Sequence, residues 1–182
     1  TQEWYYDSDD IVYFGQNKSV TSNTASAKFK YIYIESKYLN HQLDNNNTYF
    51  DWAVCVLDNN CGESQGYLPI AREKSLNNSL NDNLTIVGYK NGYVYQTISN
   101  VLYNGNELFE NAHRKIDYTN NTAGGNSGSP IFDNNNIVIG IHVGGGAIKY
   151  ENNGSTMYSK SGTTFVDKLY FLSKHLINGG TL

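Results

Sequence analysis

The stretch GGNSGSP, residues 124–130, places the hydroxyl of Ser127 among an unusual number of glycines. Gly125 lies two positions before this serine and Gly128 follows it directly. The layout is typical of a nucleophile whose neighbouring backbone N–H groups must be reachable by a substrate oxygen. A serine nucleophile also needs a general base, which is almost always a histidine. The stretch therefore predicts a catalytic turn and raises the question of which histidine would serve it.

Outward from this turn, the sequence reads as short strands separated by turn clusters. Tyr, Val, Ile and Thr dominate the strand candidates, while asparagine runs such as DNNN supply the turns. The expected strands cover residues 11–14, 28–35, 52–58, 83–89, 93–103, 115–119, 130–133, 137–143, 147–151 and 157–160. One segment, residues 163–177, is instead predicted to form a C-terminal helix, because its apolar residues recur on one face.

The strands fall into two unequal groups on either side of a seam at residues 66–82. About seven expected strands follow the seam, enough to close a small barrel. Only three precede it, and three strands leave open edges that natural proteins avoid. We therefore expect an all-β chain in which residues 1–68 form part of a first barrel and residues 69–182 form a second barrel plus the helix.

Composition excludes several classes of protein. The net charge is −4 and the chain has no long basic cluster, so neither nucleic acid nor an anionic membrane is an expected partner. The chain contains no apolar run of the roughly 18 residues that a spanning helix needs, and it reads as a mature, processed product. Cys55 and Cys61 could form a small-loop disulfide, bridge to another chain or remain buried thiols.

Three further motifs accompany the serine turn. FDWAV, residues 50–54, places Asp51 directly before an apolar strand, IVIGIHVGGG covers residues 137–146, and LDNNCGESQGYLPI covers residues 57–70. Together with the serine turn they resemble the trypsin-like serine proteases, and most closely the glutamyl endopeptidase branch. This resemblance implies a chymotrypsin-like double antiparallel β-barrel, with the first barrel incomplete in this chain.

The resemblance also implies roles for individual residues. Ser127 would be the nucleophile and Asp51 the carboxylate that orients the catalytic histidine. The backbone N–H groups of Gly125 and Ser127 would form the oxyanion hole, and Gly125 would allow the unusual torsions that this needs. Asn126 stands where many animal relatives carry an Asp that pairs with a newly freed N-terminus, so that form of activation is not expected.

Substrate specificity is likewise implied by position. His142 would lie at the floor of the S1 pocket, which receives the side chain before the scissile bond, and Thr122 would share the task. Asn121 occupies the position of the Asp with which trypsin-type enzymes bind Arg or Lys. The expected cleavage is therefore after Glu, and more weakly after Asp. The substrate backbone would pair with an edge formed by Val143, Gly144 and Gly145.

The general base is not where the resemblance would place it. The start of the chain, TQEWYYDSDD, contains no histidine. His41 would sit on the loop that leads to Asp51, and His113 and His175 have no expected function. An α/β-hydrolase order, with Asp167 and His175 serving Ser127, is disfavoured because Ser129 replaces the fifth glycine of that motif.

We therefore expect a secreted serine endopeptidase whose histidine is supplied by a separate N-terminal chain of the same precursor. Its partners would be that chain and protein or peptide substrates, and no metal or organic cofactor is implied. A non-catalytic, protease-like domain that binds peptides or proteins is the alternative, because it would need no general base.

Overall fold

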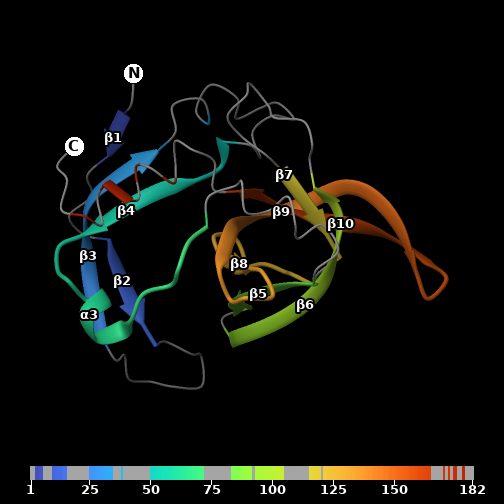
Figure 1. Ribbon diagram of the computed structural model, residues 1–182, viewed down its shortest axis with the longest axis horizontal. Coiled ribbons are helices and arrows are strands. Elements are labelled where there is room, and N and C mark those ends of the chain that lie inside the picture. Colours follow the sequence, from blue (N-terminus) through green and yellow to red (C-terminus); the bar gives the residue numbers. More distant parts are fainter. Residues whose placement is uncertain are drawn as a thin grey trace.

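The computed structural model of the chain describes residues 3–5, 10–15, 25–34, 38, 50–71, 83–91, 93–104, 115–119, 121–164, 170, 172, 174, 175 and 178. This part of the chain forms two sheets, an open one at the left of Figure 1 and a closed barrel at the right. Within the described residues, no helix is long and apolar enough to cross a membrane.

The open sheet is built around one long central strand, β3 (Ala25–Ile34), which pairs with all three of its neighbours. These are β1 (Glu3–Tyr5), β2 (Ile11–Phe14) and β4 (Ala53–Leu57). The sheet does not close in the described part of the chain, which confirms the expected incomplete first barrel. β1 was not predicted, because three residues are too few to show an alternating pattern. A short helix, α3 (Gly62–Gln65), follows β4.

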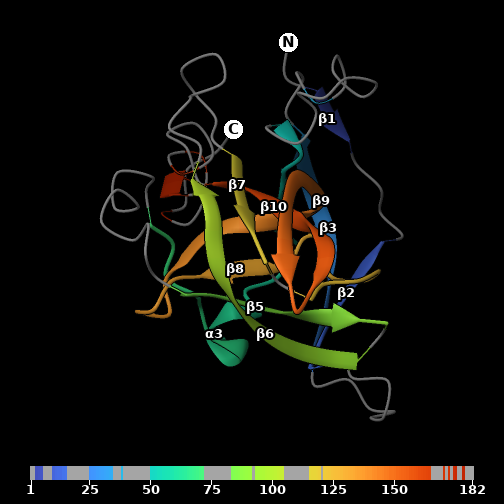
Figure 2. The ribbon, with the colours of Figure 1, turned by 90° about the vertical axis from the view of Figure 1, so that its right-hand side faces the viewer.

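The barrel contains six antiparallel strands that close in the order β10-β7-β6-β5-β8-β9. Their bounds are β5 Asn83–Lys90, β6 Tyr93–Asn104, β7 Lys115–Tyr118, β8 Pro130–Phe132, β9 Val138–Asn152 and β10 Ser155–Thr164. In Figure 2 the right-hand side of Figure 1 faces the viewer, so that the barrel lies in front, with β6 and the β9–β10 hairpin toward the viewer. The all-β fold class is confirmed.

Two sequence-based expectations about the barrel were wrong. The two strands expected at residues 137–143 and 147–151 are one continuous strand, β9, which begins at Val138. The glycines at 144 and 145 remain in the ladder because they pair with Ser161 and Lys160 of β10, beside two register shifts that absorb the local irregularity. The segment 163–177 does not begin as a helix either, because Thr163 pairs with Ile141 and is fully buried. Helical backbone is present at residues 170, 172, 174 and 175.

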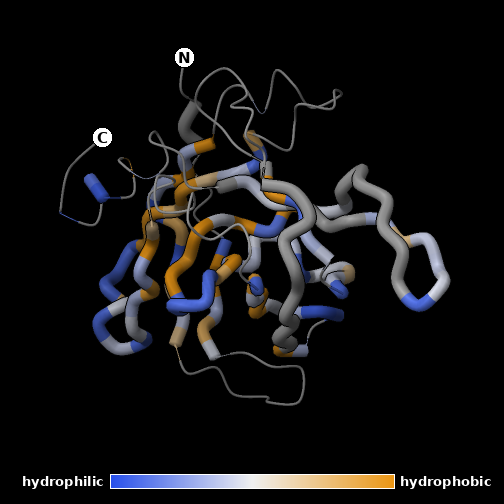
Figure 3. The backbone as a smooth tube through the Cα atoms, turned by 45° about the vertical axis from the view of Figure 1, so that its right-hand side comes forward, coloured by the Kyte–Doolittle hydropathy of each residue, from blue (hydrophilic) through white to orange (hydrophobic). Residues whose placement is uncertain are grey.

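Alternation along the strands produces two apolar clusters. The first fills the barrel and comprises Leu84, Ile86, Ile116, Tyr118, Ile131 and Ile139. The second comprises Tyr33, Trp52, Phe132 and Val138, and joins the open sheet to the barrel. Figure 3 shows hydrophobic stretches along the strands and hydrophilic residues at the turns between them. The two sheets are therefore packed on each other through shared apolar side chains.

The two thiols line the same groove, with Cys55 on β4 and Cys61 just before α3. Cys55 is exposed, Cys61 is half-buried, and neither is bonded to the other. Both line a groove of about 590 Å³ that runs between β4 and α3. Of the alternatives raised by the sequence, the small-loop disulfide is therefore not the state found in the structure.

The barrel core makes a direct prediction about stability. Ile86 is fully buried, so Ile86→Ala leaves a cavity and should lower the free energy of unfolding by about 2–5 kcal/mol. Val94 lies on the paired strand β6 but is 49 % exposed, so Val94→Ala should change it by no more than about 0.5 kcal/mol. Urea denaturation of both variants measures the difference, and equal losses would contradict this account of the core.

Candidate active site

The serine turn, residues 121–129, connects β7 to β8 and is held against β9 by backbone hydrogen bonds. The Gly128 amide donates to the His142 carbonyl at 2.8 Å, and the His142 amide donates to the Ser129 carbonyl at 2.9 Å. Ser127 itself is exposed. The rigid barrel therefore presents the predicted nucleophile at its surface, within reach of a substrate.

Glycine is required at position 125 by both conformation and space. Its φ is +93°, and a Cβ there would collide with the Tyr89 carbonyl oxygen. The neighbouring Gly124 carbonyl accepts a hydrogen bond from the Asn91 amide at 2.9 Å, which fixes the turn on the β5–β6 hairpin. Within the described residues, the amides of Gly125 and Ser127 donate to no protein acceptor. These are the two amides that an oxyanion hole would need.

Asn126 stabilises the turn by hydrogen bonds within it. Its side chain is fully buried, and its Oδ1 accepts a hydrogen bond from the Ala123 amide at 3.2 Å. Its own amide donates back to the Ala123 carbonyl at 3.1 Å. The side-chain Nδ2 has no hydrogen-bond partner in the described part of the chain. This neutral residue thus stabilises the turn through its carbonyl oxygen and brings no charge to the site.

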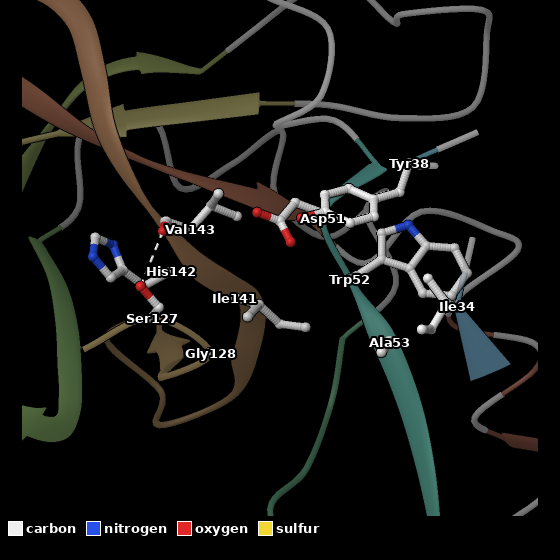
Figure 4. A pocket seen from close by; sticks show the side chains of 10 residues that line it. All are labelled: Ile34, Tyr38, Asp51, Trp52, Ala53, Ser127, Gly128, Ile141, His142 and Val143. Carbon is white, nitrogen blue, oxygen red and sulfur yellow. Dashed lines mark hydrogen bonds between the residues drawn. The ribbon is translucent and has the colours of Figure 1, made fainter. Parts of the chain in front are cut away.

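A pocket of about 340 Å³ brings the serine turn and the open sheet together (Figure 4). The Ser127 hydroxyl stands on the barrel wall and donates to the Val143 carbonyl oxygen at 3.3 Å. Asp51 stands on the opposite wall, beside the start of β4. The lining residues are Ile34, Tyr38, Asp51, Trp52, Ala53, Ser127, Gly128, Ile141, His142 and Val143. Two residues 76 positions apart in sequence are therefore brought to one pocket.

Asp51 is fixed by the aromatic residues on either side of it. Phe50 and Trp52 are both buried, and the Trp52 ring stacks on Tyr33 with ring centroids 5.6 Å apart. The Asp51 carboxyl group between them is half-buried, and this burial raises its pKa above the usual value. The carboxyl group has no hydrogen-bond partner within the described residues. The site thus holds a desolvated carboxyl group that would be stabilised by a cationic or hydrogen-bonding partner.

His142 cannot be that partner in the observed arrangement. Figure 4 shows its ring directed away from Asp51. The ring is buried in the barrel, where its Nδ1 lies 2.7 Å from the Tyr118 hydroxyl. Thr122, the other residue expected in the S1 pocket, is also buried. Among the described residues lining this pocket, His142 is the one imidazole, so the general base does not come from this set.

The β9 segment beside Ser127 is paired with a described strand on one edge only beyond Ile141. Gly144 and Gly145 pair with β10 on one side. On the other side, the ladder between β8 and β9 ends at Ile141. Neither strand paired with β9 therefore covers the second edge beside Val143 and Gly144, where an extended peptide could add main-chain hydrogen bonds.

The ammonium group of Lys90, at the end of β5, lies beside the turn, and position 121 of the turn carries no acid. Asn121 is exposed, and its backbone carbonyl accepts a hydrogen bond from the Lys90 ammonium group at 3.3 Å. An ammonium group here makes the surroundings of the turn more favourable for an acidic side chain than for a basic one.

Of the remaining histidines, only His175 lies within the described residues, and it does not line this pocket. His41, His113 and Asp167 lie outside the described residues, while His175 is exposed on helical backbone. The α/β-hydrolase order was disfavoured from the sequence, and β8 now directly follows the serine turn where that fold would place a helix.

Sequence reasoning missed two residues that matter to the site. Tyr38 lines the pocket with Asp51, and Tyr118 contacts His142 from 24 positions away. No local motif marks either residue, because their roles arise from strand pairing and from the packing of one sheet on the other.

The comparisons with known proteins agree with this geometry. The trypsin family profile matches residues 5–167. A glutamyl endopeptidase of Staphylococcus epidermidis is 35 % identical over 86 residues, which is 45 % of this chain and 28 % of that protein. One of Staphylococcus aureus (strain MW2) is 29 % identical over 102 residues, or 54 % of this chain and 28 % of that protein.

A solved structure shares the fold along most of the chain. It is a Glu endopeptidase in complex with MPD, with a TM-score of 0.63 and 25 % identity, covering 91 % of this chain and 70 % of that one. The matched segments span under a third of the length of the two curated relatives. Because the family profile spans most of the 182 residues and the architecture agrees, the chain belongs to the trypsin family.

Proposed function

We propose that this chain is the serine- and aspartate-bearing part of a secreted serine endopeptidase that cleaves after Glu and, more weakly, after Asp. One observation carries the proposal: Ser127 and Asp51, which come from different sheets, line the same pocket in a chain of the trypsin family. That arrangement matches the nucleophile and orienting carboxylate of a catalytic triad.

The mechanism follows from these positions. A histidine between the two residues takes the Ser127 proton while Asp51 stabilises the resulting imidazolium. Ser127 then attacks the substrate carbonyl, and the amides of Gly125 and Ser127 donate to the developing oxyanion. The acyl-enzyme that forms is released by water.

The histidine is proposed to come from a separate N-terminal chain of the same precursor. The outer edge of β4 supports this, because β4 pairs only with β3 among the described strands and a groove follows its length. Free strand edges accept further strands readily. In this proposal the added strands complete a first barrel that includes residues 1–68, and residues 69–182 form the second unit.

Preference for an acidic side chain is supported by the chemistry around the turn. His142 and Thr122 can donate hydrogen bonds, and the Lys90 ammonium group lies beside Asn121. The relatives named glutamyl endopeptidases point the same way. A basic substrate side chain would find no carboxylate at position 121.

A second candidate function is a protease-like domain that binds peptides without cleaving them. It is favoured by the same pocket, in which the described residues place no imidazole between Ser127 and Asp51. The first experiment below separates the two functions.

A fluorophosphonate probe should label Ser127 in the native protein, because only a serine activated by a base reacts with it. Mass spectrometry locates the label, and Ser127→Ala is the control that should remain unlabelled. Sequencing of every polypeptide in the labelled sample should identify the one that carries the histidine. An unlabelled native protein would favour the binding domain.

His142→Ala should reduce the preference for Glu over Gln about tenfold, because one donor to the substrate acid is removed. The ratio of kcat/KM values for matched Glu and Gln peptides measures it. His175→Ala, at an exposed position, is the matched control and should retain the preference. If the His142 variant kept the parent ratio, the specificity determinant would lie elsewhere.

Asp51→Asn should have opposite effects on stability and activity. Burial raises the Asp51 pKa, so the ionised carboxylate lowers the stability of the fold at neutral pH. The Asp51→Asn variant of the 182-residue chain, without a partner, should therefore unfold at a higher temperature than the parent chain. The gain should shrink as the pH falls toward 3.8, where Asp51 is increasingly protonated in both states. Loss of the triad carboxylate should lower kcat about 10⁴-fold.

Thermal unfolding of the 182-residue chain from pH 4 to 8 checks the stability effect. Asp10→Asn, which changes an exposed carboxylate, is the control. A loss of stability in the Asp51 variant at neutral pH would contradict the electrostatic account.

A further inference from the structure

A tyrosine and a histidine form a buried pair on the wall of the barrel. Tyr118 on β7 is fully buried and His142 on β9 is 3 % exposed. The Tyr118 hydroxyl and the His142 Nδ1 lie 2.7 Å apart, and the ring centroids are 6.0 Å apart. This is a short hydrogen bond in a region that water does not reach, so its direction decides where the imidazole carries its proton.

The phenol is the donor in this hydrogen bond. Burial raises the Tyr118 pKa well above its usual value, and the neighbouring Asp117 raises it further, so the hydroxyl keeps its proton. Within the described residues, His142 Nδ1 is the one hydrogen-bond partner of that hydroxyl. If Nδ1 carried a hydrogen instead, the phenolic O–H would be a buried donor without an acceptor, which folded proteins avoid. Nδ1 is therefore the acceptor.

The barrel leaves room for this contact through a glycine on the facing strand. Gly162 of β10 is the register partner of His142. A Cβ at Gly162 would lie 3.1 Å from the Tyr118 hydroxyl oxygen and 2.5 Å from the Ile141 carbonyl oxygen. The pair is thus enclosed by the barrel wall, and its geometry is set by β7, β9 and β10 together.

We propose that Tyr118 is a positioning residue that holds His142 as the tautomer with its proton on Nε2. Every hydrogen bond that the neutral ring makes through Nε2 is then one in which it donates. A ring fixed in this form suits a substrate carboxylate and cannot accept a hydrogen from an amide NH₂ or an ammonium group. This substrate consequence rests on the proposed S1 role of His142, whereas the tautomer does not.

The tautomer can be measured without any catalysis. We would prepare the full protein as Ser127→Ala with ¹⁵N-labelled histidine and record ring nitrogen resonances at neutral pH. The expected result is a His142 ring protonated at Nε2, and Tyr118→Phe should shift it toward a mixture of both tautomers. Tyr33→Phe, which removes a hydroxyl from a comparably buried ring, is the matched control and should leave His142 unchanged.

Two results of this measurement would overturn the inference. One is a His142 ring protonated at Nδ1 in the parent protein, and the other is an unchanged tautomer in Tyr118→Phe. Thermal unfolding of each variant verifies that it is folded, and a loss of fold in Tyr118→Phe would leave the parent spectrum to decide.

The consequence for substrate choice is measured in the active protein. Tyr118→Phe should lower kcat/KM for a Glu peptide about five- to tenfold, mainly through KM, and should reduce the Glu-to-Gln ratio. An unchanged ratio beside a changed tautomer would overturn the substrate part. A parent protein that cleaves Glu and Gln peptides equally would instead contradict the proposed S1 role of His142, and the spectrum would still decide the role of Tyr118.

Discussion

The packing of Trp52 and Tyr33 against Phe132 and Val138 is the contact on which the rest of the structure depends. These four side chains come from the open sheet and from the barrel, and they exclude water between them. Trp52 directly follows Asp51, and Phe132 lies in the strand that begins after the serine turn. The same apolar contact that stabilises the chain therefore sets the position of Asp51 relative to Ser127.

In the site built on this contact, the ionised Asp51 carboxylate is electrostatically unfavourable. The aromatic neighbours that fix the Asp51 backbone also remove water from its carboxyl group, and this raises its pKa. A positively charged imidazole beside it would offset that cost, and the proposed catalytic mechanism would form one during each acylation. A carboxylate that is unfavourable in this chain by itself is thus suited to a completed triad, and functional sites often sacrifice stability in this way.

Much of the fold was predictable because it is encoded at short range. The strand-favouring residues at 83–89 predicted the strand that is observed as β5, and the glycines around Ser127 predicted a turn, in which Gly125 has a positive φ. The errors have a common cause. The continuity of β9 and the strand conformation of Thr163 depend on pairing with each other's strands, and no local pattern reveals pairing. β1 is similarly defined by its partner β3 and not by its three residues.

The sequence by itself determined the glycine-rich turn around Ser127 and the all-β architecture, because a local motif encodes the first and local residue composition the second, and it supplied the residues from which roles for Ser127 and Asp51 are proposed. Only the tertiary structure decided that Ser127 and Asp51 share a pocket and that the His142 ring turns toward Tyr118. The physical reason is that a hydrogen bond between residues 24 positions apart exists only where strand register and core packing bring them together.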